Sequence, residues 1–127
     1  MATPHSSNEY FGDSVALDNG VAVVGASLTR KAYVLTNSGS SWTQQTTLLT
    51  GTTIGAVYGV DVLGQTAVLV HSTKVTIFGQ TGSSWAETKS FPHQFAGITF
   101  GQPVGLMPGW VLVGTPNDNA VYVYPSN

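Results

Sequence analysis

Short apolar runs separated by turn sequences recur along the chain. Residues 21–24 are apolar at every position, which is typical of a strand covered on both faces by neighbouring sheets. Residues 43–49 and 86–91 instead alternate, as half-exposed outer strands do. Turn sequences such as Asp18-Asn19-Gly20 separate the runs, and Asn-Gly is the strongest two-residue hairpin signal. The pattern predicts antiparallel strands joined by tight turns.

The runs form an internal repeat of about 40–47 residues. Its most literal copy is Gly-Ser-Ser-Trp, which occurs at residues 39–42 and again at residues 82–85. The other shared landmarks are an aromatic-glycine pair (11–12, 58–59, 100–101), a following valine (Val15, Val62, Val104), a second valine with its successor (24–25, 70–71, 113–114) and a strand-like run (32–35, 75–78, 121–124). Such a period indicates a repeat architecture.

Each period predicts one four-stranded antiparallel sheet. The first two strands make a tight hairpin, a short loop leads to the third, and the Gly-Ser-Ser-Trp turn leads to the outer strand. One such sheet per repeat describes a β-propeller blade. We therefore predict an all-β fold of three blades at residues 11–53, 54–95 and 96–127, the last without its outer strand, after a tail or closing strand at residues 1–10.

Composition supports this class and excludes others. The chain has 127 residues, about one domain, and only 8% are charged. Abundant valine, threonine and glycine favour strands and turns and exclude an all-α fold. The net charge is −2 and basic residues do not gather, so we expect no nucleic-acid partner. No apolar run approaches the roughly 20 residues of a membrane span, and the absence of cysteine leaves the compartment open.

Two of the segments resemble FG-GAP repeats, the blades of integrin α-chain-type β-propellers. Phe11-Gly12 with residues 24–26, and Phe100-Gly101 with residues 113–116, carry the resemblance, while His71 stands at the glycine in the second segment. The resemblance implies binding or adhesion. Many members hold calcium in a loop that is here shortened to residues 18–20, with one carboxylate. Because calcium takes six to eight oxygen ligands, we expect no metal and no other cofactor.

Three blades are fewer than the typical four to eight of a closed propeller. We therefore expect a homo-oligomer, first of all a dimer that closes a six-bladed ring. Residues 1–9 are candidates for the missing outer strand of the last blade, within the chain or across to its partner. A head-to-tail filament and a piece of a longer propeller are the alternatives.

Catalytic arrangements are not indicated. Ser14 follows Gly12-Asp13, but position 16 is alanine, whereas a nucleophile elbow needs Gly-x-Ser-x-Gly before a helix. The three histidines, at positions 5, 71 and 93, lack metal spacing. The carboxylates, among them Asp13, Asp18, Asp61, Glu87 and Asp118, are dispersed and are interpreted as turn caps and solvated groups. We therefore expect that the protein is not an enzyme.

Aromatic side chains and rim loops are the candidate binding groups. Trp42 and Trp85 recur at one blade position, where packing of the outer strand is favoured over ligand binding, and Trp110 replaces Val21 and Thr66 of the other segments. The remaining candidates are Tyr10 and Tyr58, and Asn117 and Asp118 in the last loop. We predict a non-enzymatic binding module, lectin-like or adhesive, with a glycan or protein ligand and a favoured extracellular location. The alternative is a self-assembling structural subunit of a fibre or surface layer.

Overall fold

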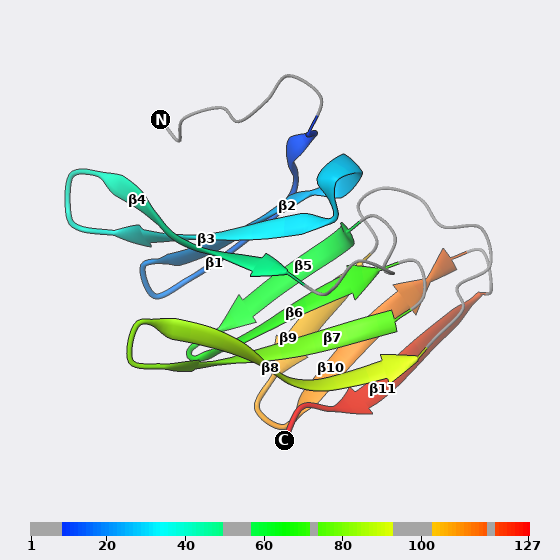
Figure 1. Ribbon diagram of the computed structural model, residues 1–127. Coiled ribbons are helices and arrows are strands. Elements are labelled where there is room, and N and C mark those ends of the chain that lie inside the picture. Colours follow the sequence, from blue (N-terminus) through cyan, green and yellow to red (C-terminus); the bar gives the residue numbers. More distant parts are fainter. Residues whose placement is uncertain (1–8, 50–56, 72–73, 93–102, 117–118) are drawn as a thin grey trace.

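The computed structural model describes residues 9–49, 57–71, 74–92, 103–116 and 119–127. They form three antiparallel sheets: sheet 1 (β1 to β4), sheet 2 (β5 to β8) and sheet 3 (β9 to β11) (Figure 1). The strands are β1 Phe11–Asp18, β2 Val21–Ala26, β3 Lys31–Asn37, β4 Trp42–Leu49, β5 Val57–Leu63, β6 Thr66–His71, β7 Lys74–Thr81, β8 Ser84–Pro92, β9 Val104–Met107, β10 Trp110–Thr115 and β11 Ala120–Pro125. The predicted all-β class is confirmed, with four, four and three strands in the described sheets.

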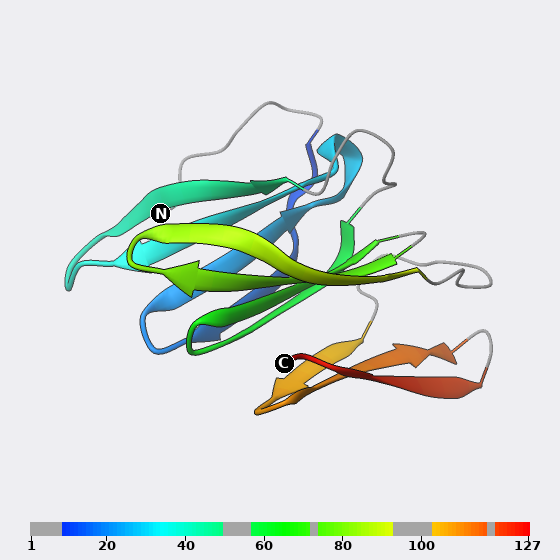
Figure 2. The same ribbon diagram turned by 60° about the horizontal axis from the view of Figure 1, so that its bottom comes forward.

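The sheets lie face to face in chain order (Figure 2). In each sheet the first two strands form a hairpin, and the three hairpins turn at the same end of the molecule, called the turn end below (Figure 1). Asn19 and Gly20 close the first hairpin with φ of 46° and 79°, the positive values that a type I′ turn needs. At the opposite end, called the loop end, the turn of 3-10 helix η1 (Ser27–Thr29) leads from β2 to β3.

Strand register corrects one predicted equivalence between the repeats. Counted from the hairpin turns, Val15 corresponds to Val60 and Val104, so the predicted match of Val62 with Val15 was wrong by two residues. One residue of the shift arises because Phe11 stands at the position of Val57 rather than of Tyr58, and the other from a difference in irregular pairing near the strand start. Two residues lie between the paired positions of Phe11 and Ser14, whereas Tyr58 alone interrupts the pairing of β5.

A glycine shared between two paired strands explains a second correction. In sheet 1, Ser14 pairs with Gly25, and a Cβ on Gly25 would collide with Ser14 Oγ. In sheet 2, the corresponding pair is Gly59 with Val70. The small residue has therefore moved to the other strand of the pair. His71 does not replace the glycine of the second repeat, as predicted, but follows one residue later.

Two apolar layers hold the three sheets together. The layer between sheets 1 and 2 contains the buried side chains Val23, Ala32, Val34, Leu48, Val57, Val60, Val62, Ala67, Leu69 and Phe78. The layer between sheets 2 and 3 contains the buried side chains Val68, Val70, Val75, Ile77, Val111 and Val113. Because successive side chains of a strand point to opposite faces, the middle sheet supplies both layers. Its inner strands β6 and β7 are apolar on both faces. The prediction that residues 21–24 lie between two sheets was wrong for one face, because β2 belongs to sheet 1 and, among the described sheets, only sheet 2 packs against it.

Two carboxylates also link neighbouring sheets. Asp18 Oδ2 accepts a hydrogen bond of 2.7 Å from the backbone N–H of Gly64, which joins sheet 1 to sheet 2. Asp61 Oδ2 accepts one of 2.7 Å from the backbone N–H of Leu106, which joins sheet 2 to sheet 3. The sequence interpretation of Asp18 and Asp61 as turn caps and solvated groups missed this role.

Candidate binding surfaces

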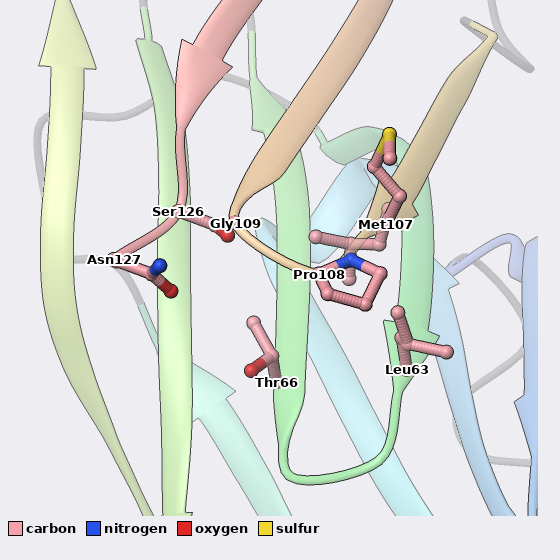
Figure 3. Close-up of a pocket in the computed structure, with 8 residues that line it drawn as sticks. Leu63, Thr66, Met107, Pro108, Gly109, Ser126 and Asn127 are labelled. Carbon is pink, nitrogen blue, oxygen red and sulfur yellow. The ribbon is translucent and has the colours of Figure 1, made fainter.

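A groove of about 400 Å³ opens between sheets 2 and 3 at the turn end (Figure 3). Sheet 2 contributes Leu63 and Thr66, the residues on either side of its first hairpin turn. The remaining lining residues come from sheet 3 and the C-terminal residues: Leu106, Met107, Pro108, Gly109, Ser126 and Asn127. The groove therefore lies between two repeats, and Figure 3 shows Thr66 and Asn127 facing each other across it.

Backbone contacts hold both walls of the groove. The N–H of Ser126 donates to the carbonyl oxygen of Gly109 at 2.9 Å, which ties the C-terminal residues to the turn between β9 and β10. The N–H of Gln80 donates to the carbonyl oxygen of Gln65 at 2.8 Å, which ties the facing turn to β7. The bond from Leu106 to Asp61 fixes β9 against β5. Both walls are thus set by the fold before any ligand arrives.

The side chains that line the groove are uncharged and include both apolar and polar groups. Leu63, Leu106, Met107 and Pro108 supply apolar surface, whereas Thr66, Ser126 and Asn127 supply hydroxyl and amide groups. None of its lining residues has a charged side chain. Such a lining favours an uncharged ligand that presents both apolar faces and hydrogen-bonding groups.

The outward face of sheet 3 is a second exposed surface. Its exposed apolar side chains, called the sheet 3 end face below, are Met107, Trp110, Leu112, Val121 and Val123. They alternate along β10 and β11 with the buried Val111 and Val113 that face sheet 2. A hollow of about 190 Å³ lies on this face beside β9, lined by Gly105, Leu106, Met107 and Leu112.

The three predicted tryptophans occupy different surroundings. Trp110 begins β10 and lies exposed on the sheet 3 end face, opposite Met107 in the strand register. Trp42 and Trp85 hold corresponding places at the start of their outer strands. Trp85 packs half-buried against the layer between sheets 1 and 2, whereas Trp42 is exposed. The same repeat position therefore serves packing in sheet 2 and faces solvent in sheet 1.

The remaining predicted site residues are not brought together with these surfaces. Tyr10 is exposed just before β1, with a positive φ of 53°. Tyr58 is half-buried at the irregular start of β5, in the middle sheet. Asn117 and Asp118 lie outside the described residues.

A polar group lies buried at the loop end between sheets 1 and 2. His71 is fully buried, and burial, with a smaller contribution from Lys74, lowers its pKa to about 4. Oxygen atoms of Asp13, Ser14 and Ser27 are also buried, and none has a hydrogen-bond partner among the described residues. Ser14 Oγ is thus not bonded to the His71 imidazole, as a serine nucleophile and its base would be.

The described residues contain neither a metal-ligand cluster nor a long apolar helix. Within these ranges, no group of three or more histidine, aspartate or glutamate side chains is placed to hold a metal ion. No helix in the same ranges is long and apolar enough to cross a membrane.

Sequence reasoning missed the groove, because its walls come from segments far apart in the chain. Thr66 and Leu63 flank one turn and Met107 flanks another, and both turns were recognised as hairpins. The signal available was the shared hairpin position, which places equivalent turns side by side in neighbouring sheets. Ser126 and Asn127 carried no signal, because they follow the last strand and match nothing in the other repeats.

A search of curated proteins finds no match to this chain. The family comparison covers the part of the chain with the clearest landmarks, including Phe11-Gly12, residues 24–26 and Trp42. Two further sheets repeat the blade-like arrangement of the first, although the match does not extend over them. Residues 1–43 match the model of the FG-GAP repeat, as the sequence resemblance predicted.

Proposed function

We propose that this chain is a non-catalytic binding module of the β-propeller type, and that the groove between sheets 2 and 3 binds a neutral carbohydrate. The observation that carries the proposal is the uncharged lining, in which Thr66, Ser126 and Asn127 lie beside Leu63 and Pro108. The match of residues 1–43 to the FG-GAP repeat supports a binding role. The position of the groove between two repeats also supports a binding role, because a rigid scaffold presents turns and loops for binding.

Carbohydrate chemistry suits this lining. A sugar ring presents hydroxyl groups at its edge and C–H groups on its faces, so that it needs both hydrogen-bonding partners and apolar contact. The Thr66 hydroxyl and the Asn127 amide offer a donor and an acceptor on opposite walls, while Leu63 and Pro108 offer the apolar contact. A charged ligand would lose its hydration here without a charged side chain in the lining to pair with it.

The test is a screen of the 127-residue chain against neutral mono- and oligosaccharides, followed by isothermal titration calorimetry of any that bind. Thr66→Val removes the hydroxyl while keeping the side-chain shape, and we expect it to weaken binding at least tenfold. The control is Thr43→Val, which makes the same exchange on the exposed strand β4. The proposal fails if no neutral sugar binds at millimolar concentration, or if both variants weaken binding equally.

A self-assembling subunit is the second candidate function, and a separate observation favours it. The sheet 3 end face leaves five large apolar side chains exposed on one side of the sheet. Apolar patches of this kind mark interaction surfaces in soluble proteins.

A further inference from the structure

The first hairpin turns of sheets 1 and 2 are joined directly at the turn end. Asp18 is the last residue of β1, and its Oδ2 accepts the hydrogen bond of 2.7 Å from the backbone N–H of Gly64 in the facing turn. We call this contact the turn link. It needs an acceptor on the residue before one turn and a backbone N–H on the first residue of the next turn.

Sheets 2 and 3 lack both halves of the turn link. Leu63 is the counterpart of Asp18, because each is the residue of the first strand that closes its hairpin in the strand register. Pro108 is the counterpart of Gly64, because each is the first residue of its turn. Leucine has no acceptor in its side chain, and proline has no backbone N–H. The turn link is therefore impossible between sheets 2 and 3.

The carboxylate that joins sheets 2 and 3 lies further along the strand. Asp61 stands two residues before Leu63 on β5, and its Oδ2 accepts the hydrogen bond of 2.7 Å from the N–H of Leu106. The corresponding residue of β1 is Ala16, which has no acceptor for such a bond. Sheet 3 is therefore fixed to sheet 2 at a point two residues from the turn, and not at the turn itself.

The groove occupies the place where the turn link would lie. Leu63 lines it from sheet 2 and Pro108 from sheet 3, and Figure 3 shows both side chains at the groove. Leu106, whose N–H is held by Asp61, lines it as well. The two residues that exclude the turn link thus supply part of the apolar lining.

We propose that Leu63 and Pro108 determine where this protein binds its ligand: they exclude the turn link, leave the groove open between sheets 2 and 3, and present apolar surface to a sugar ring. This inference deepens the proposed function and rests on it for the identity of the ligand. The opening of the groove follows from the two residues themselves, so it is tested without a sugar. The corresponding place between sheets 1 and 2 is bridged by the turn link.

Two substitutions rebuild the turn link between sheets 2 and 3. Leu63→Asp supplies the carboxylate, and Pro108→Gly supplies the backbone N–H. Glycine also adopts the positive φ of 58° that Gly64 has in the existing link, whereas proline is restricted to a negative φ. Neither substitution alone completes the bond. The parent chain, the two single variants and the double variant therefore form a complete cycle that isolates the link.

The opening of the groove is measured by the reactivity of a thiol placed in its wall. The chain has no cysteine, so Thr66→Cys gives each of the four backgrounds one reactive group. We expect iodoacetamide to modify it at least tenfold more slowly in the double-variant background than in the parent background, and at nearly the parent rate in each single-variant background. The matched control is Thr43→Cys on exposed strand β4, whose rate should be the same in all four backgrounds.

Hydrogen exchange measures the link itself. Pro108→Gly introduces an amide at position 108, and we expect its exchange to slow at least tenfold when Leu63→Asp is added. Should the double variant not show the circular dichroism of the parent chain, Leu63→Asn replaces Leu63→Asp, because the amide carbonyl offers an acceptor without a charge.

Each outcome decides the proposal. Slow modification confined to the double-variant background, with slow exchange at position 108, supports it. Equal rates in all four backgrounds overturn it. Slowing that is already complete with Leu63→Asp alone also overturns it, since the cause would then be the added charge and not the link. If the double variant closes the groove but leaves the affinity for a neutral sugar unchanged, the proposed sugar site is wrong, whereas Leu63 and Pro108 still account for the opening of the groove.

Discussion

The middle sheet is held differently on its two faces. Towards sheet 1, the first-strand side chains Val60 and Val62 are buried, and Leu48 reaches the layer from outer strand β4. Towards sheet 3, the corresponding side chains Val104 and Leu106 are only half-buried. Sheets of the same repeat therefore do not pack equally well. The layer between sheets 2 and 3 closes less completely over its apolar residues.

The described part of sheet 3 has no fourth strand, and this accounts for part of the difference. Sheet 1 carries four strands and sheet 3 three in the described residues. In the second layer, the outer strand β8 contributes Phe91, which stacks on Tyr124 of β11 with ring centroids 4.9 Å apart. Local stability follows buried apolar contact, so we expect sheet 3 to open before sheets 1 and 2 do.

The largest effect is expected from removing one large side chain from each face of sheet 2. Leu69 lies in the layer against sheet 1 and Ile77 in the layer against sheet 3, and they are 0% and 1% exposed. Large-to-small changes in a core cost about 2–5 kcal/mol. We expect Leu69→Ala to lie at the upper end of that range and to destabilise sheets 1 and 2 together in urea unfolding.

Ile77→Ala is the matched variant on the weaker face. We expect it to lie near the lower end of the range of about 2–5 kcal/mol, and to raise hydrogen exchange in β9 to β11 while β1 to β3 stay protected. The comparison fails if Ile77→Ala opens sheet 1 as readily as sheet 3, because the three sheets would then unfold as one unit.

The strands and their order were predictable because they depend on local signals. Tight turns such as Asn19-Gly20, together with the repeated Gly-Ser-Ser-Trp, predict hairpins, and hairpins fix which strands are neighbours. The register was less predictable. Landmarks such as Tyr58-Gly59 lie at an irregular pairing, and the number of unpaired residues there, which differs between β1 and β5, carries no sequence signal.

The candidate groove was not predictable, because it depends on how two sheets meet. The aromatic residues drew attention in the sequence, yet Trp42 and Trp85 differ in burial although they share a repeat position. Their difference comes from what lies beside each outer strand. Thr66 looked unremarkable as a strand start, and only its placement opposite Asn127 makes it a candidate binding residue.

The next largest effect on stability is expected from lowering the pH, and it acts on the contact between sheets 1 and 2. His71 lies on the face of β6 towards sheet 1, and its burial lowers its pKa from 6.5 to about 4. Between these values the unfolded chain binds a proton that the folded chain does not. Stability therefore falls as the pH falls from about 6.5 to about 4, in total by about 3 kcal/mol.

Urea unfolding at pH 7 and at pH 4.5 measures this dependence. The informative variant is His71→Ala, because alanine stands at the same position of sheet 1, as Ala26. We expect the variant to lose less stability on acidification than the parent chain, by about 2–3 kcal/mol. Carboxylates titrate in both proteins, so their contribution cancels in the difference. Equal losses of stability in the two proteins would show that His71 does not make the contact between sheets 1 and 2 acid-sensitive.

The smallest effects are expected from removing the two carboxylates that bridge the sheets. Here the larger cost is expected at the contact between sheets 2 and 3, whereas the larger cost of a core substitution is expected at the contact between sheets 1 and 2. The bond from Leu106 to Asp61 is partly buried, whereas the bond from Gly64 to Asp18 is exposed. Asp61→Ala leaves a sheltered N–H unpaired and costs about 2 kcal/mol, whereas water replaces the acceptor in Asp18→Ala at a cost of about 0.5 kcal/mol. Hydrogen exchange of the Leu106 and Gly64 amides, measured with the unfolding free energies, checks both values. The layer between sheets 2 and 3 buries its apolar side chains less completely than the layer between sheets 1 and 2. The hydrogen bond from Leu106 to Asp61 therefore contributes a larger share of the stability of that contact. Equal costs for the two variants would contradict that division.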